Sequence, residues 1–140
     1  MEPNNIYVPV LAIKSGVTDL EFYKKAFGAT ILWRLNSADG SVHVAALAIN
    51  SAVFRVHEEG SKSLSPEKAG GTTVTIGLTT DDVHAVMEQA VAAGALVLSP
   101  VIDYEYGYRQ GEIRDPFGHH WIIEKLFNPE ALDNFVKEKG

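Results

Sequence analysis

Cysteine is absent from this chain of 140 residues. Its absence excludes disulfides, thiolate metal ligands and a cysteine nucleophile, and it fits a reducing compartment. No apolar run approaches the roughly 18 to 20 residues that a membrane span needs. The N-terminal stretch MEPNNIYVPV also lacks the basic and apolar regions of a signal peptide. We therefore expect a cytoplasmic protein with no membrane partner.

Positive charge is scarce as well. The chain has 12 Lys and Arg against 18 Asp and Glu, which gives a net charge of −6, and its basic residues do not cluster. Because nucleic-acid binding relies on a basic surface, we exclude nucleic acid as a partner. The sequence also contains no nucleophile elbow, P-loop, dinucleotide fingerprint or HExxH motif.

The residues that are present suit one ordinary domain, with 46% hydrophobic and 21% charged positions. Two segments follow the same order of features, DLEFYKKAFGATIL (19–32) and DVHAVMEQAVAAGALVL (82–98). Each runs from an acidic helix start through apolar helical spacing to Gly-Ala and an apolar strand. Aligning Gly28 with Gly94 also places YVPVLAI (7–13) on TVTIGLT (73–79). The sequence thus indicates two copies of one unit.

Each copy is predicted to be βαβββ, from apolar periodicity and from turn signals such as ADGS (38–41). The first copy is expected to contain a strand at 6–13, a helix at 17–27 and strands at 30–36, 43–49 and 52–58. The second is expected to contain a strand at 73–79, a helix at 82–93 and strands at 96–101, 107–114 and 119–126. Asp81 is the expected N-cap of the second helix.

A short C-terminal helix is predicted over 129–138, with Asn128 as its N-cap and Pro129 at its first position. We expect it to pack on the body or on a second subunit. The prediction is therefore an α+β protein in which one domain, 1–140, contains two modules at about 5–58 and 73–126. The polar stretch 59–72 between them is interpreted as a solvated linker.

Strand alternation predicts which side chains line a binding cleft. In VFRVH (53–57), Phe54 and Val56 are expected on the helix side, which leaves Arg55 and His57 on the opposite face. In HWIIE (120–124), Trp121 and Ile123 go to the core, which leaves His120, Ile122 and Glu124 opposite. Because an unpaired arginine in a cleft is costly, Arg55 should meet either Glu124 or an anionic group of a ligand.

Aromatic residues leave two interpretations open. Tyr104, Tyr106 and Tyr108 alternate in YEYGY, which fits cross-strand packing or an aromatic wall for a planar ligand. Trp33 fits either a buried core position or a stacking platform.

Arg109 is expected to pair with Asp103 or Glu112, or to reach an anionic ligand. Asp115-Pro116-Phe117-Gly118 has the chemistry of a structural turn. His119, beside that turn, is expected to be partly exposed.

Three stretches carry a family resemblance: DLEFYKKAFGA, the AGG at 69–71 before TTVTIGLTTDDVHAVMEQAVAAGA, and YGYRQGEIRDPFGHHW. They resemble the glyoxalase/bleomycin-resistance/dioxygenase superfamily, also called vicinal oxygen chelate proteins, and within it the short bleomycin-resistance-like and phosphonate-operon-associated branch. The resemblance covers 5–126 and implies paired βαβββ modules in a cupped, incomplete barrel, commonly a homodimer. It does not fix an activity, because the superfamily includes isomerases, dioxygenases, thiol transferases and drug-sequestering proteins.

The resemblance also locates a metal site. Metal-using members place His in the first strand of each module and Glu in the last, seven residues after the Asp of the D-P-x-G turn. That position here is Ile122, its first-half counterpart is about Arg55, and the first-strand positions fall near Tyr7 and Thr73. Because these side chains cannot form an imidazole and carboxylate shell, we expect no metal and no cofactor.

We therefore predict a metal-independent small-molecule-binding protein that sequesters an antibiotic or toxin, forms a homodimer and has no catalytic residues. The expected ligand-binding residues are Tyr7, Trp33, Arg55, His57, Tyr106, Tyr108, Arg109, His120 and Glu124. The acidic net charge mildly favours cationic ligands. One alternative is a metal-dependent lyase, isomerase or dioxygenase with a displaced His57/His120/Glu124 site. Another is a regulatory or protein-interaction domain with a degenerate cleft.

Overall fold

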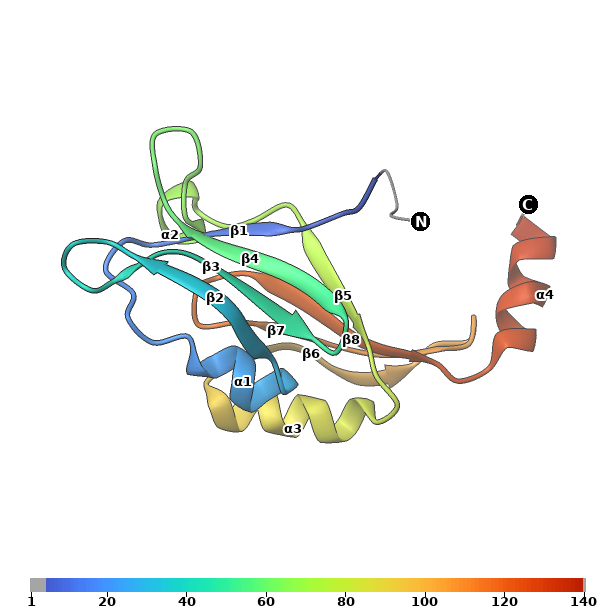
Figure 1. The fold of residues 1–140 in the computed structure, drawn as a ribbon. Helices are drawn as coiled ribbons and strands as arrows, with labels where there is room; N and C mark the ends of the chain where they lie inside the picture. Colours follow the sequence, from blue (N-terminus) through green and yellow to red (C-terminus); the bar gives the residue numbers. More distant parts are fainter. Residues whose placement is uncertain (1–4, 140) are drawn as a thin grey trace. The chain divides into compact units, whose positions relative to one another are not determined.

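The computed structural model describes residues 5–139. The chain divides into two units, residues 1–71 and residues 72–140. Each unit contains an open, mixed four-stranded sheet with helices (Figure 1). The predicted α+β class, the two βαβββ repeats and the short C-terminal helix are confirmed. No helix among residues 5–139 is long and apolar enough to cross a membrane.

The first unit follows the predicted βαβββ order. Its elements are β1 (Val10–Ile13), α1 (Glu21–Phe27), β2 (Thr30–Asn36), β3 (Val42–Ile49), β4 (Ala52–Glu58) and α2 (Pro66–Ala69). The strand order is β1-β4-β3-β2, and β1 is parallel to β4 while the other pairs are antiparallel. Helix α1 packs on one face, where the Tyr23 and Phe54 rings meet edge to face at 5.1 Å.

The second unit repeats this topology. Its elements are β5 (Thr75–Thr79), α3 (Val83–Ala93), β6 (Leu96–Asp103), β7 (Tyr108–Arg114), β8 (His120–Leu126) and α4 (Pro129–Lys139). The strand order is β5-β8-β7-β6, again with a single parallel pair, β5 and β8. Helix α3 runs along one face of this sheet (Figure 1).

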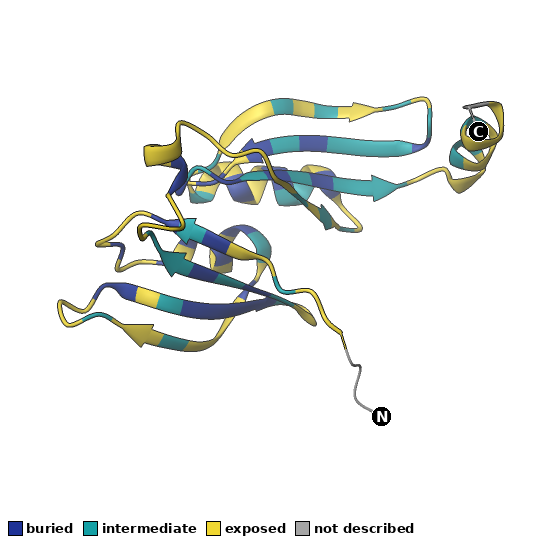
Figure 2. Ribbon diagram, turned by 90° about the horizontal axis from the view of Figure 1, so that it is seen from above, coloured by how far each residue is buried: buried dark blue, intermediate teal, exposed yellow. Residues whose placement is uncertain are grey.

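Burial alternates along the last strand of each unit, as the sequence predicts (Figure 2). Phe54 and Val56 are 5% and 0% exposed, and Trp121 and Ile123 are 2% and 0% exposed. These four side chains face the helices and build the cores. The opposite face of each sheet is therefore free to carry polar side chains.

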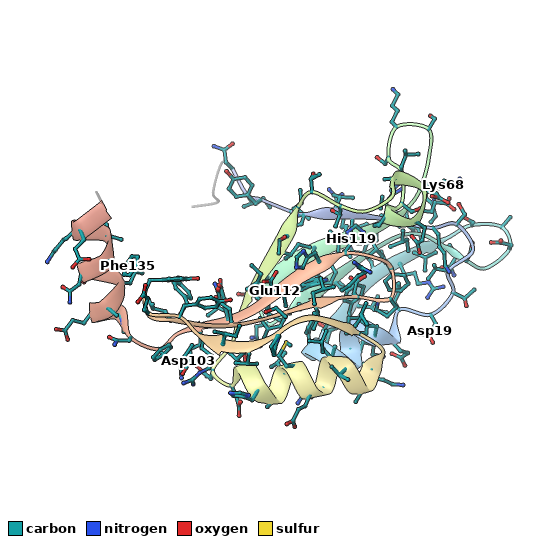
Figure 3. All side chains as sticks on the ribbon, turned by 180° about the vertical axis from the view of Figure 1, so that it is seen from behind. Asp19, Lys68, Asp103, Glu112, His119 and Phe135 are labelled. Carbon is teal, nitrogen blue, oxygen red and sulfur yellow. The ribbon has the colours of Figure 1, made fainter. Side chains whose placement is uncertain are left out.

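The turn at 115–118 is a structural element. Asp115 is buried, and its Oδ1 accepts hydrogen bonds from the backbone N–H groups of Phe117 and His119 at 2.9 and 3.0 Å. Its Oδ2 accepts from Trp121 Nε1 at 3.0 Å. The expectation of a partly exposed His119 is wrong, because these bonds draw the hairpin onto the core and leave His119 8% exposed (Figure 3).

Helix starts differ from the sequence prediction in three places. Asp82, rather than Asp81, caps α3 by accepting from the N–H of Ala85 at 3.0 Å. Helix α1 begins at Glu21 instead of residue 17, and the Asp19 carboxylate accepts from the N–H of Glu21. The linker prediction missed α2, although SPEKAGG contains its signals: Ser65 is the N-cap, Pro66 the first position and Gly70 the left-handed C-cap.

Helix α4 contacts the rest of the second unit through the ring of Phe135. Its cap is the predicted one, since Asn128 Oδ1 accepts from the N–H of Ala131 at 3.1 Å. The Phe135 ring lies 6.1 Å from the Tyr106 ring in an edge-to-face arrangement. The tail helix thus packs on the hairpin between β6 and β7.

Candidate functional site

A line of hydrogen bonds crosses the second sheet on the face opposite α3. Gln110 on β7 and Glu124 on β8 are direct cross-strand partners. The side-chain amide of Gln110 donates from Nε2 to Glu124 Oε1 at 2.7 Å, and the Tyr106 hydroxyl donates to Gln110 Oε1 at 3.0 Å. Gln110 fixes both neighbours at once. Sequence reasoning did not single it out, although strand alternation places it on the side of β7 that faces away from the core.

Glycine at position 77 leaves room beside the Glu124 carboxylate. Gly77 lies on β5, and a Cβ atom built there would stand 3.3 Å from Glu124 Oε2. Glu124 Oε1 is taken by Gln110, whereas Oε2 has no hydrogen-bond partner among residues 5–139. The second carboxylate oxygen is therefore available to a ligand that brings an N–H or O–H donor.

His120 on β8 lies on the same face as Glu112 on the neighbouring strand β7. Its Nε2 is 2.7 Å from Glu112 Oε1, and its Nδ1 is 3.3 Å from the hydroxyl of Thr75. Both ring nitrogens are thus engaged within the unit. We call the set formed by Thr75, Gln110, Glu112, His120 and Glu124 the polar face.

The three tyrosines pack on one another at the end of β7. Tyr104 and Tyr106 stack with ring centroids 5.3 Å apart, and Tyr108 is 5.9 Å from Tyr106. Burial is the main cause that raises the pKa of the Tyr106 phenol, and the neighbouring tyrosines and carboxylates add to it. The tyrosines therefore pack on one another around the turn between β6 and β7, and Tyr104 and Tyr108 remain partly exposed.

Arg109 stands apart from the polar face. It shares strand parity with Gly111 and Ile113, which face α3. Its guanidinium makes a two-point ion pair with Asp103, at 2.6 Å from Nε and 3.0 Å from Nη2, and lies 4.9 Å from the Phe127 ring centroid. The hydrogen bond from Arg109 lowers the pKa of Asp103. Of the partners that the sequence left open, Asp103 is the one observed.

Arg55 is a half-buried cation of the first unit that makes no ion pair with residues 5–139. It lies on β4, and its backbone N–H bonds to the Pro9 carbonyl at 2.9 Å. Its side-chain Nε is buried and has no hydrogen-bond partner among residues 5–139. This is the position at which the sequence led us to expect Glu124 or a ligand.

Two aromatic candidates of the first unit are solvent-exposed. Trp33 on β2 is 45% exposed, so the interpretation of a buried core tryptophan is wrong. Tyr7 is 99% exposed and precedes β1, which begins at Val10 rather than at residue 6. Tyr7 makes no side-chain contact with the described part of the first unit that would fix its ring.

A pair of histidines borders an open pocket at the end of β4. His43 Nδ1 is 2.7 Å from Glu58 Oε1, and His57 Nδ1 is 2.7 Å from the Glu58 carbonyl oxygen. Their ring centroids are 4.9 Å apart. The pocket has a volume of about 360 Å³ and is lined by His43, His57 and residues 58–63. The hydrogen bond from His43 is the main cause that lowers the pKa of Glu58.

Sequence comparison places the chain in a family. The model of the Glyoxalase/Bleomycin resistance protein/Dioxygenase superfamily matches residues 18–123. The chain belongs to this superfamily. An uncharacterised protein of Mycobacterium bovis, Mb0911c, is 41% identical over 130 residues, which cover 89% of this chain and 86% of that protein.

Solved structures of the superfamily fold resemble the chain closely. The Arabidopsis thaliana gene product At5g48480 has a TM-score of 0.67 and 29% identity, covering 85% of this chain and 97% of its own. TioX from Micromonospora sp. ML1 has a TM-score of 0.63 and 26% identity, and the match covers 86% of this chain and 95% of the TioX chain.

The metal site known from the superfamily does not fit the side chains present. Ile122 stands at the expected carboxylate position, and Tyr7 and Thr73 precede the strands β1 and β5. Neither unit places three or more His, Asp or Glu side chains of residues 5–139 around a common metal position. In the displaced alternative, His57 belongs to the first unit and His120 and Glu124 to the second. His120 would have to release Glu112 or Thr75 to bind a metal.

Proposed function

We propose that this protein binds a small molecule without a metal ion, as a member of the bleomycin-resistance-like branch of its superfamily. The observation that carries the proposal is the fixed line from Tyr106 through Gln110 to Glu124. Hydrogen-bonding groups held on rigid strands bind a ligand with little loss of side-chain entropy.

The polar face favours a ligand with hydrogen-bond donors. Glu124 Oε2, beside the space left by Gly77, accepts an N–H or O–H group of the ligand. A charged acceptor makes such a bond stronger than a neutral pair would. Glu112, two residues after Gln110 on β7, and His120, four residues before Glu124 on β8, extend the same surface in one direction along the sheet.

Binding alone suffices for the proposed role. A protein that holds an antibiotic or toxin lowers its free concentration without forming or breaking a bond, so no catalytic residue is assigned. The proposal also includes a homodimer, which the family resemblance implies, and a cytoplasmic location, which the composition favours. The alternative of a regulatory domain with a degenerate cleft predicts no small-molecule ligand.

Metal analysis tests the first half of the proposal. The purified protein is dialysed against Ni²⁺, Zn²⁺ or Mn²⁺, freed of excess metal and subjected to elemental analysis. We expect less than stoichiometric metal in wild type. Stoichiometric metal that is lost in Glu124→Ala, but kept in the exposed control Glu88→Ala on α3, would overturn metal independence.

Thermal-shift screening of antibiotics and small acids tests the second half. A ligand that binds the native state raises Tm with its concentration by mass action. We expect at least one compound to stabilise wild type and to lose most of its effect in Glu124→Gln, whereas Glu88→Gln retains it. If no compound in a broad collection shifts Tm, the regulatory alternative replaces the proposal.

A further inference from the structure

The row of residues across the first sheet at Arg55 has an unusual composition. Trp33 on β2 pairs with Ala46 on β3, Ala46 pairs with Arg55 on β4, and Arg55 pairs with Val10 on β1. Direct cross-strand partners point to the same side of a sheet. The side opposite α1 therefore presents an indole, a methyl group and a guanidinium in succession, which we call the Trp33–Arg55 row.

The cation in this row has no counterion among the residues that the structure describes. An arginine side chain stays charged in proteins and cannot relieve its burial by losing a proton. The Nε of Arg55 is nevertheless buried, with no acceptor among residues 5–139. Its neighbours in the row, Val10 and Ala46, offer no polar side-chain atom.

The carboxylates described in the first unit are engaged elsewhere. Glu58 accepts from His43 and Ser37, and Glu59 accepts from Ser15 and Ser65. The remaining partners are Ser41 for Asp39, the N–H of Glu21 for Asp19 and Lys24 for Glu21. Glu67 lies on the exposed surface of α2 and makes no ion pair with Arg55.

The charge balance of the first unit also permits an anion. Residues 1–71 contain seven Lys and Arg and seven Asp and Glu, whereas residues 72–140 contain five and eleven. The net charge of −6 therefore belongs wholly to the second unit. At Arg55 the local charge, and not the charge of the chain, determines which ligand group is attracted, because salt screens charges beyond about 8 Å.

We propose that the first sheet binds a small molecule by itself: Arg55 anchors an oxyanion, namely a carboxylate, phosphonate or phosphate, while Trp33 stacks on an apolar planar part of the same molecule. The inference rests on the proposed small-molecule binding and adds to it a site in the first unit with its own ligand class. A guanidinium offers a planar fork that suits two oxygens of such a group. Trp33 is 45% exposed and free to offer its ring face.

Strand spacing sets the dimensions of this ligand. Trp33 and Arg55 lie two strands apart, which corresponds to about 10 Å between their backbones. Ala46, between them, is 2% exposed and contributes only a methyl group to the row. The ligand class is therefore an aromatic or other planar group joined to an oxyanion by a spacer of a few atoms.

A matched series of probes tests the charge requirement. The probes are 4-phenylbutyrate, 4-phenylbutanol and 4-phenylbutylamine, which share a ring and spacer and differ in the charge of the head group. Titration calorimetry on the full chain should give a Kd for the acid at least tenfold below those of the alcohol and the amine. Inorganic phosphate should compete with the acid.

Variants separate the two anchors. Arg55→Met should remove the preference for the acid, while Trp33→Ala should raise the Kd of the acid and of the alcohol by a similar factor. Arg114→Met is the matched control, because Arg114 is exposed on β7 and makes no ion pair with the described residues. Without ligand, Arg55→Met should keep or raise Tm, since it removes a buried polar atom that has no partner.

The outcomes distinguish this inference from the proposed function. If the screened compounds that stabilise wild type are all neutral or cationic, or if Arg55→Met leaves binding of the anions unchanged, the inference is wrong and small-molecule binding stands. If Arg55→Met lowers Tm strongly in the absence of ligand, Arg55 is neutralised by the protein itself and the inference is also wrong. If no compound binds wild type, both proposals fail.

Discussion

Gln110 lies directly across the second sheet from Glu124, and its side-chain amide donates a 2.7 Å hydrogen bond to the carboxylate. The Tyr106 hydroxyl uses the other end of the same amide. A protein side chain thus orients Glu124, and the residue one pleat earlier at the family's ligand position is Ile122. These two hydrogen bonds therefore fix the position of the Glu124 carboxylate.

Removing Gln110 should destabilise the second unit. Gln110→Met keeps the length of the side chain but leaves the Tyr106 hydroxyl and one Glu124 oxygen without their partner, which should cost about 1–3 kcal/mol of unfolding free energy. Urea denaturation measures the change. Gln89→Met, on the exposed surface of α3, is the control and should cost far less. An equal loss in both variants would show that the hydrogen bonds of Gln110 to Tyr106 and Glu124 add nothing to stability.

Tyr106 should ionise at higher pH than its ordinary value of 10.0, because burial disfavours the phenolate. An absorbance titration at 295 nm should show a component above pH 10 that disappears in Tyr106→Phe. Because the pKa of Tyr106 is raised in the folded state, the neutral phenol contributes stability that is present below pH 10 and is lost as the pH rises through the folded pKa. Tyr7→Phe, at a 99% exposed position, should retain the component.

Glu59 should stabilise the first unit in a pH-dependent manner. Its carboxylate accepts from the backbone N–H groups of Ser65 and Ser15 and pairs with Lys68 at 3.4 Å. The hydrogen bond from the Ser65 side chain is the main cause that lowers the pKa of Glu59 below 4.5. A lowered folded pKa gives stability that is present above pH 4.5 and is lost as the pH falls through the folded value.

Glu59→Gln should therefore lower Tm at pH 7, and the difference from wild type should shrink steadily below pH 4.5. Thermal melts monitored by circular dichroism at several pH values check this. Glu67→Gln on α2 serves as the control and should give a small difference at every pH. A difference for Glu59→Gln that stays constant down to pH 3 would rule out the ionised carboxylate as its source.

Strand alternation predicted the cores, because a side chain's face depends on parity alone. It placed Phe54, Val56, Trp121 and Ile123 on the buried side, and the structure agrees. The bounds of β2 and β4 match the predicted 30–36 and 52–58, since turn residues delimit both strands.

Partners across strands could not be predicted at the same level. The hydrogen bond from Gln110 to Glu124 depends on the register between neighbouring strands. Register is also shifted where β2 pairs with β3 and where β6 pairs with β7, and no sequence signal indicates these irregularities. The isolation of Arg55 depends on where every nearby carboxylate finds its own partner. The sequence identified Arg55 and Glu124 as candidates, and the structure supplied the neighbours that give each of them a distinct role.

Gly111 should be intolerant of a side chain for steric reasons. A Cβ atom built at Gly111 would lie 2.8 Å from Met87 Sδ and Cε, and Gly111 does not have a positive φ that would add backbone strain. Met87 is 6% exposed and has little space to retreat. Gly111→Ala should therefore cost about 1–3 kcal/mol through overpacking.

A double-mutant cycle tests that mechanism. Met87→Ala alone should cost about 2–5 kcal/mol by leaving a cavity, and the new methyl group of Gly111→Ala should partly fill it. The double variant should then be more stable than the sum of the single changes by at least 0.5 kcal/mol, roughly the limit for independent sites. Gly60→Ala, with no heavy atom within 4 Å of its built Cβ, is the control. Strict additivity of the two changes would mean that the contact with Met87 on α3 is not what destabilises Gly111→Ala.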